Sequence, residues 1–108
     1  MLPIDYLAGA RRDFDESFDW YAARSTQVAQ RFVAAVDAAL ANVVANPLRF
    51  ASPDGVHREC PVKKFPFRIV YRLVDDRVLV VAVAHVKRRP GYWRDRIWSM
   101  HEPIDEYG

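Results

Sequence analysis

Basic and aromatic side chains gather in the second half of this 108-residue chain. From residue 57 to residue 96 there are eleven lysines and arginines against four acids, a net charge of +7, while the remainder carries −5 and the whole chain +2. The densest part holds Lys87, Arg88, Arg89, Tyr92 and Trp93. Such a concentration of charge favours binding to a nucleic acid or an acidic polypeptide. A solvated basic surface with no ligand is the alternative.

Two strands joined by a tight turn are expected to position much of this charge. The runs 65–74 and 77–85 are rich in β-branched and aromatic residues, and Asp75-Asp76 between them is typical of a two-residue hairpin turn, although it lacks glycine. With these two residues in the turn, Val74 opposes Arg77. A regular ladder then places Arg68 opposite Val83.

This register predicts two different faces for the hairpin. One face is wholly apolar and is expected to bury against helices: Phe67, Ile69, Tyr71, Leu73, Val78, Val80, Ala82 and Ala84. The other mixes charged and aliphatic side chains: Arg68, Val70, Arg72, Leu79, Val81, Val83 and His85. There His85 lies diagonal to Arg68, at ~7–8 Å between backbones. We therefore expect Arg68, Arg72 and His85 to share one open, cationic surface.

Two amphipathic helices are predicted to cover the apolar face. The first runs over residues 9–24, and its apolar stripe holds Ala10, Phe14, Phe18 and Tyr21. The second begins at a cap formed by Ser25 or Thr26 and ends at Asn46-Pro47. Residues 3–7 and 56–62 are expected to form further strands. Pro90 suits the first turn of a short terminal helix, and residues 100–108 are expected to form a loosely held acidic tail.

The fold class expected from these elements is α+β, in a single domain over residues 1–108. An N-terminal strand and a helical hairpin pack on a small antiparallel sheet, and a short helix follows. Cys60 is the only cysteine, which excludes an internal disulfide, and no Cys/His cluster has metal-site spacing, so neither metal nor cofactor is expected. No apolar run approaches the ~20 residues of a membrane span, and a signal peptide is lacking, which indicates a cytoplasmic protein.

The order of the elements and three motifs resemble those of the RelE/ParE toxin superfamily. The motifs are Phe67-Arg68-Ile69-Val70-Tyr71-Arg72, Asp75-Asp76-Arg77-Val78 and His85-Val86-Lys87-Arg88-Arg89-Pro90-Gly91-Tyr92-Trp93. The resemblance covers nearly the whole chain. It implies the toxin of a type II toxin–antitoxin, or plasmid stabilisation, pair, neutralised in a hetero-oligomer by an antitoxin encoded by the adjacent gene. RelE-like relatives cleave messenger RNA in the ribosomal A site, whereas ParE-like relatives bind and block DNA gyrase.

For the RNA-cleaving branch the resemblance implies a metal-free site. A ribose 2′-OH attacks the adjacent phosphate, a base takes its proton, cations stabilise the phosphorane and an acid protonates the leaving oxygen. The resemblance assigns Arg68 to the scissile phosphate and Arg88 to a second catalytic position. His85 is a candidate acid because its unperturbed pKa lies near neutrality. Glu59 is a candidate base, and Tyr92 could stack on a nucleobase or replace the terminal tyrosine of that branch.

One departure favours the gyrase-binding branch. RelE-like proteins carry lysines on the second strand, but Lys63 and Lys64 come later in this chain, so cations that the phosphorane needs are missing. In the binding interpretation the contacts come from Arg72, Lys87, Arg89, Tyr92, Trp93, Lys63 and Lys64. A third possibility is a module that has lost toxicity and only binds an antitoxin.

Each candidate also has a structural explanation. Arg68 could cover the sheet and hold the acidic antitoxin, and His85 could be a hydrogen-bonded strand end. Glu59 could be a surface carboxylate paired with Lys63 or Arg58. Tyr92 and Trp93 could pack the terminal helix onto the core.

Overall fold

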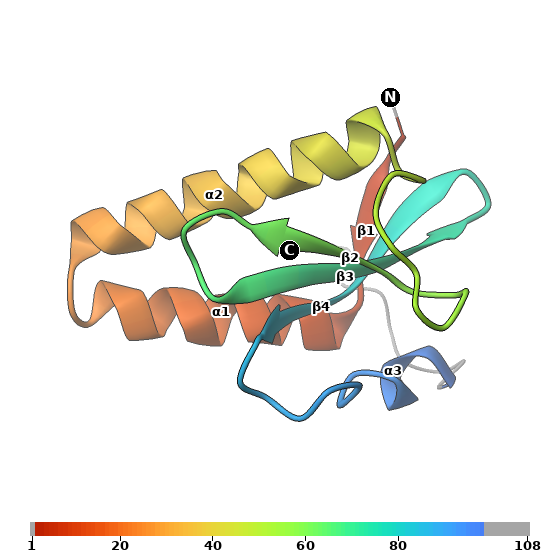
Figure 1. The fold of residues 1–108 in the computed structure, drawn as a ribbon. Helices are drawn as coiled ribbons and strands as arrows, with labels where there is room; N and C mark the ends of the chain where they lie inside the picture. The colour runs from red at the N-terminus through yellow and green to blue at the C-terminus, as the bar shows by residue number, and fades with distance from the viewer. Residues whose placement is uncertain (1, 99–108) are drawn as a thin grey trace.

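The structure is a computed structural model that describes residues 2–98, so the predicted tail at 100–108 lies outside the described residues. Figure 1 shows two long helices and a four-stranded sheet, followed by a short helix. The elements are β1 (Ile4–Tyr6), α1 (Ala8–Ala22), α2 (Thr26–Ala45), β2 (Arg58–Val62), β3 (Phe67–Val74), β4 (Arg77–His85) and α3 (Asp95–Trp98). The predicted α+β class is confirmed.

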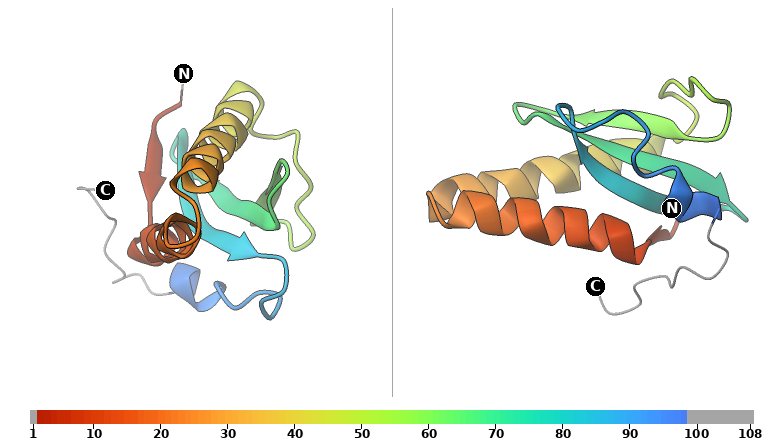
Figure 2. Two further views of the ribbon diagram at one scale, coloured as in Figure 1. Left: turned by 90° about the vertical axis from the view of Figure 1, so that its left-hand side faces the viewer. Right: turned by 90° about the horizontal axis from the view of Figure 1, so that it is seen from below.

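The sheet has the strand order β1-β4-β3-β2. β2, β3 and β4 pair antiparallel as predicted, whereas β1 pairs parallel to β4, so the sheet is mixed. The α1–α2 hairpin packs on one face, and α3 lies beside α1 (Figure 2). Parallel pairing needs a long connection, and α1, α2, β2 and β3 all lie between β1 and β4 in the chain.

Local sequence signals set the ends of α2. The Ser25 hydroxyl accepts a hydrogen bond from the Val28 N–H at 3.2 Å, which satisfies one of the free donors of the first turn. The helix ends at Asn46, directly before Pro47. By length and composition α2 could cross a membrane, but its stripe of Phe32, Val36 and Val43 is buried in the core, as in the core helix of a soluble domain.

Aromatic side chains join the helical hairpin to the sheet. Phe14 of α1 stacks on Phe32 of α2 with ring centroids 5.5 Å apart, and Tyr21 lies 5.2 Å from Phe32. Phe32 also lies 5.2 Å from Phe67 of β3. The aromatic stripe predicted on α1 is therefore part of the core, where close ring contacts add to the stabilisation from buried area.

The two hairpin-turn residues adopt the backbone that a tight turn requires. Asp75 and Asp76 have φ of 49° and 61°, the left-handed pair that matches the twist of the two strands it connects. The terminal helix begins later than expected, at Asp95. Gly91 has φ of 76°, so a helix starting near Pro90 is interrupted there and consecutive turns follow.

Candidate functional site

A β-bulge in β4 overturns the predicted faces of the hairpin. Near the turn the register is as expected, with Arg72 opposite Leu79, but after Tyr71 and Val80 the next pair is Val70 with Ala82. Val81 is therefore the extra residue. Arg68 opposes Ala84 and not Val83, and because side chains alternate, a slip of one residue exchanges the faces beyond it.

His85 consequently lies on the opposite face of the sheet from Arg68 and Arg72. It pairs with Phe67, and the two rings are 5.0 Å apart on the helix-covered face. Its Nδ1 accepts a hydrogen bond from the Lys87 N–H at 3.0 Å, so the neutral ring carries its proton on Nε2. The expectation that Arg68, Arg72 and His85 share one surface was wrong.

The face that carries Arg68 and Arg72 is partly covered. Arg68 is exposed, and Glu59, opposite Val70, lies on the same face. Arg72 is half-buried, and its Nε has no hydrogen-bond partner among the described residues. Trp93 packs against Leu7 and three neighbours in the sheet: Val70, Ala82 and Ala84. The prediction of a wholly open face was therefore wrong, because the C-terminal segment folds back over its apolar part.

Trp93 also covers a buried histidine. The His57 ring lies 4.5 Å from the Trp93 ring, and its Nδ1 is 2.5 Å from the Asp54 carboxylate. Asp54 also accepts hydrogen bonds from the backbone N–H groups of Val56 and His57. Burial opposes ionisation of Asp54, but these hydrogen bonds prevail and hold the pKa of its carboxyl well below the usual value. The structural explanation of Trp93 therefore fits its contacts.

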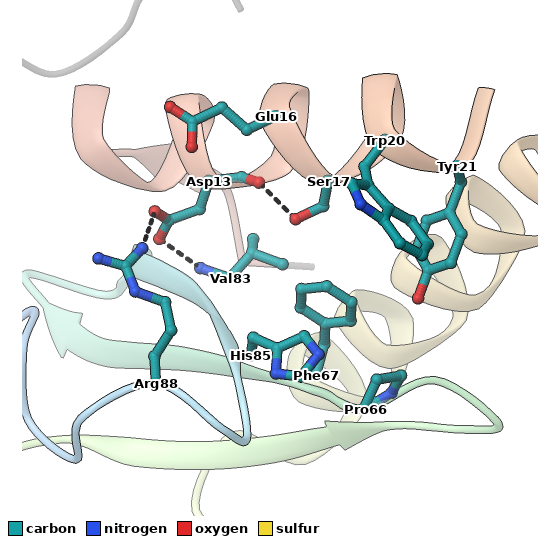
Figure 3. Close-up of a pocket in the computed structure, with 10 residues that line it drawn as sticks. All are labelled: Asp13, Glu16, Ser17, Trp20, Tyr21, Pro66, Phe67, Val83, His85 and Arg88. Atoms are coloured by element: carbon teal, nitrogen blue, oxygen red, sulfur yellow. Dashed lines mark hydrogen bonds and ion pairs between the residues drawn. The ribbon is translucent and has the colours of Figure 1, made fainter. Parts of the chain in front are cut away.

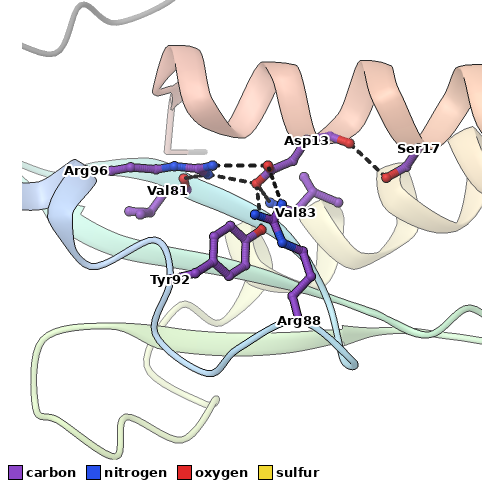
Figure 4. Close-up of polar contacts among 7 residues, drawn as sticks. All are labelled: Asp13, Ser17, Val81, Val83, Arg88, Tyr92 and Arg96. Carbon is purple, nitrogen blue, oxygen red and sulfur yellow. Dashed lines mark hydrogen bonds and ion pairs between the residues drawn. The ribbon is translucent and has the colours of Figure 1, made fainter.

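Asp13 is the centre of the polar network that sequence reasoning missed (Figure 4). It is 7% exposed, and its carboxylate accepts hydrogen bonds from the Val83 N–H and the Tyr92 hydroxyl, each at 3.1 Å. Arg96 donates two more, at 2.8 and 3.1 Å. A sequence signal did exist, because Asp13 lies three residues after Ala10 on the buried side of α1, where an acid needs a partner.

The same network holds the chain after β4 against the bulge. Arg96 donates to the Val81 carbonyl at 3.1 Å as well as to Asp13. The Arg88 guanidinium lies 3.7 Å from the centre of the Tyr92 ring and 3.9 Å from the Asp13 carboxylate. Burial and the charge of Asp13 raise the pKa of Tyr92 to about 12. Arg88 and Tyr92 are therefore brought together beside Asp13 of α1.

A groove lies between α1 and the end of β4 (Figure 3). Its volume is about 570 Å³, and its lining is mainly apolar. We call it the α1–β4 groove and define it by Trp20, Tyr21, Phe67, Val83, His85 and Arg88, with Asp13, Glu16, Ser17 and Pro66 completing the lining. A mainly apolar concave site with a few polar groups is the usual form of a binding pocket.

Four exposed cations lie at one end of the sheet. Lys63 and Lys64 are in the turn before β3, and Lys87 and Arg89 follow β4. The Val86 N–H donates to the Pro66 carbonyl at 3.0 Å, which joins these two segments. We call this surface, Lys63, Lys64, Lys87 and Arg89, the cationic end. The structure thus brings together four of the basic residues expected to bind a partner.

Glu59 is not in an ion pair with any residue among positions 2–98, and Arg58 instead donates to the carbonyls of Leu48 and Phe50. No group of three or more His, Cys, Asp or Glu in that same range is placed to hold a metal ion. Cys60 is buried, and burial raises the pKa of its thiol.

Comparison with protein families gives a match. A model of the family described as "ParE toxin of type II toxin-antitoxin system, parDE" matches residues 4–90. The matched range runs from β1 through the basic segment after β4. No curated protein sequence matches the chain.

Proposed function

Because this match spans most of its length, the chain belongs to the ParE toxin family of type II toxin–antitoxin systems, and we propose that it inhibits growth by binding DNA gyrase without cleaving a substrate. The protein is thus the toxin of a pair whose other member is a cognate antitoxin. The proposal concerns the target and the absence of hydrolysis.

The observation that carries the proposal is the placement of Arg68 and His85 on opposite faces of the sheet. General acid–base cleavage of RNA needs its base, its acid and its cations within hydrogen-bond reach of a single phosphate. The bulge at Val81 separates the arginine from the histidine by the thickness of the sheet. This separation supports binding in preference to hydrolysis.

The other catalytic candidates are also poorly disposed for RNA cleavage. Arg88 and Tyr92 are engaged with Asp13 of α1, and the Tyr92 hydroxyl donates a hydrogen bond to that carboxylate. Glu59 lies on the face of Arg68, without the lysines that the resemblance leads one to expect beside it. A catalytic set divided in this way would need a large rearrangement on the ribosome.

The cationic end is the surface that we assign to the target. Its four cations are exposed, so they can contact a partner without giving up internal ion pairs. Exposed positive charge accelerates encounter with an acidic protein surface or with a protein already bound to DNA. Arg68 lies nearby in β3 and extends the same positive potential over the sheet.

A pair of assays tests the proposal. Purified toxin is added to gyrase with relaxed plasmid DNA and, separately, to translating ribosomes carrying a labelled messenger RNA. Inhibited supercoiling with intact RNA is the expected result. Cleavage of ribosome-bound RNA that disappears in the Arg68→Ala/Arg88→Ala double variant would overturn it. Harmless overexpression with normal antitoxin binding would contradict it in favour of a module without toxicity.

A further inference from the structure

We propose that His57 and Arg72 form a subsite for one carboxylate group, and that an acidic side chain of the target protein occupies it. Both residues belong to the sheet face that carries Glu59 and Arg68, which we call the outer face. The inference rests on the proposed function in taking gyrase as the target, and it adds a contact and its chemistry. The subsite lies apart from the cationic end, because Arg72 is five positions along β3 from Phe67, a distance of about 17 Å.

The strand register places His57 and Arg72 side by side. Arg58 pairs with Tyr71 at the end of the antiparallel β2–β3 ladder, so the next position sets His57 opposite Arg72. The His57 N–H donates to the Asp54 carboxylate and therefore not to β3. Facing residues that exchange no backbone hydrogen bonds bring their side chains closest, with Cβ atoms about 4.5–5.5 Å apart. The imidazole and the guanidinium are thus neighbours on the outer face.

Each of these two side chains has a buried nitrogen without a hydrogen-bond partner among residues 2–98: Nε2 of His57 and Nε of Arg72. His57 is 6% exposed, and its Nδ1 faces Asp54, so Nε2 is the ring atom left for another group. Arg72 is half-buried and forms no ion pair within the described part of the chain. Buried polar atoms are nearly always satisfied in folded proteins, and buried cations are usually paired. Two such nitrogens at facing positions therefore indicate a shared ligand.

A carboxylate matches the hydrogen-bonding groups at this position. Arg72 can donate from Nε and from one Nη to the two oxygens of a carboxylate, in the side-on bidentate arrangement. His57 donates from Nε2 once the ring is protonated, and the Asp54 carboxylate at Nδ1 then balances the charge of the imidazolium. Binding should therefore take up a proton from solvent at Nε2 wherever the free ring is neutral.

The charged groups around the two side chains leave a place for one negative charge. Asp54 lies behind the His57 ring, and Glu59 is the next outer-face residue along β2. The C-terminal segment brings Trp93 to 4.5 Å from the His57 ring, and Arg94 lies 5.6 Å from the centre of the Trp93 ring. Together with the guanidinium of the subsite, two cations and two carboxylates balance while the imidazole is neutral. Protonation of the ring adds the charge that a bound carboxylate cancels.

The arrangement of the outer face favours a protein over a nucleic acid as the source of the carboxylate or other anion. Glu59 pairs with Val70, which lies between Arg68 and Arg72 on β3, so a carboxylate stands beside the path from one arginine to the other. A chain of phosphates that followed this path would be repelled by Glu59. A protein surface can place a single carboxylate at Arg72 and keep its other acidic groups away from Glu59.

The first arm of the test uses the free toxin and sodium acetate as the probe. Acetate is titrated into the ¹⁵N-labelled protein at constant ionic strength, with sodium chloride as the balancing salt, and the side-chain nitrogens are followed by NMR. We expect His57 Nε2 and Arg72 Nε to shift together and to saturate with a Kd of about 10–100 mM, tighter at pH 6 than at pH 8. Arg72→Gln should reduce the His57 response at least about fivefold. Arg77→Gln is the matched control, because Arg77 lies on the same hairpin and is already paired with Asp5.

The second arm measures inhibition of gyrase supercoiling by the same proteins. Arg72→Gln should raise the concentration needed for half-inhibition by about tenfold, and Arg77→Gln by less than about twofold. Arg72→Lys should cost at least about fivefold, because an ammonium group keeps the charge but cannot donate side-on to both oxygens. Circular dichroism checks that each variant is folded, and Arg72→Lys carries the comparison if Arg72→Gln is not.

A wild-type toxin in which acetate shifts neither His57 nor Arg72 would overturn the inference, since a water molecule would then suffice at this position. Equal losses of inhibition in Arg72→Gln and Arg77→Gln would also overturn it, because net charge alone would explain them. Loss of the acetate response in Arg72→Gln with unchanged gyrase inhibition would refute the assignment of the occupant to the target. The acetate arm contains no gyrase, so a wild-type toxin that leaves gyrase active contradicts the proposed function and not the anion subsite itself.

Discussion

The carboxylate of Asp13 and the guanidinium of Arg96 form a two-pronged ion pair between residues 83 positions apart in the chain. Only 6% of the Asp13 side chain and 17% of the Arg96 side chain are exposed. The pair connects α1 to the start of α3 and, through the Val81 carbonyl, to the bulge in β4. It therefore closes the C-terminal segment over the sheet and fixes the place of Tyr92 and Arg88 beside the α1–β4 groove.

Removal of one partner of this pair should strongly destabilise the fold. Asp13→Asn leaves the Arg96 charge uncompensated, and we expect a loss of about 3 kcal/mol in the free energy of unfolding by urea denaturation. The matched control is Asp15→Asn on the same helix, whose exposed pair with Arg11 at 3.5 Å should contribute less than about 0.5 kcal/mol. Equal effects of the two variants would contradict the assigned importance of Asp13.

Gly9 should tolerate alanine only when Arg96 is shortened. A Cβ at Gly9 would lie 2.5 Å from the Arg96 Nε, and that guanidinium is held by Asp13 and the Val81 carbonyl. We expect Gly9→Ala to destabilise the protein by about 1–3 kcal/mol in thermal and urea unfolding. In the Arg96→Ala background the same change should be neutral or stabilising by up to about 1 kcal/mol, because alanine favours the helix. A persistent cost in that background would refute the close approach.

Asp54 should make the fold sensitive to acid. Its pKa lies below the usual value of 3.8, so its contribution to stability is present above pH 3.8 and is lost as the pH falls below that value toward the folded-state pKa. Wild-type and Asp54→Asn proteins should therefore differ most in free energy of unfolding near neutral pH and converge in strong acid. Urea titrations over a series of pH values measure this difference, and a gap that widens on acidification would show the sign to be wrong.

The cationic end should govern how binding to the target depends on salt. The double variant Lys87→Gln/Arg89→Gln removes two exposed charges, and we expect about tenfold weaker gyrase inhibition at low salt with a flatter dependence on ionic strength. Arg31→Gln removes an exposed charge from α2 and serves as the control. Equal loss in both proteins would indicate an effect of net charge alone.

Much of the fold could be predicted from local signals. Ser25 before α2, Asn46-Pro47 after it and the Asp75-Asp76 turn each act within a few residues, through hydrogen bonds and backbone angles. The apolar stripe of α2 follows from helical periodicity. The basic second half and its concentration of charge are properties of composition, and so they too could be read directly from the chain.

The site depended on contacts that no local pattern specifies. From Val78 to Ala84 every residue of β4 is apolar, so alternation could not show that Val81 is an extra residue or on which face His85 lies. The partner of Asp13 lies 83 positions away, and its bond forms only when α1, the bulge and the C-terminal segment are packed together. The sequence by itself determined the elements and the charge, because these arise from neighbouring residues. Only tertiary packing decided which charged groups meet, because that choice depends on the register of one strand and on long-range burial.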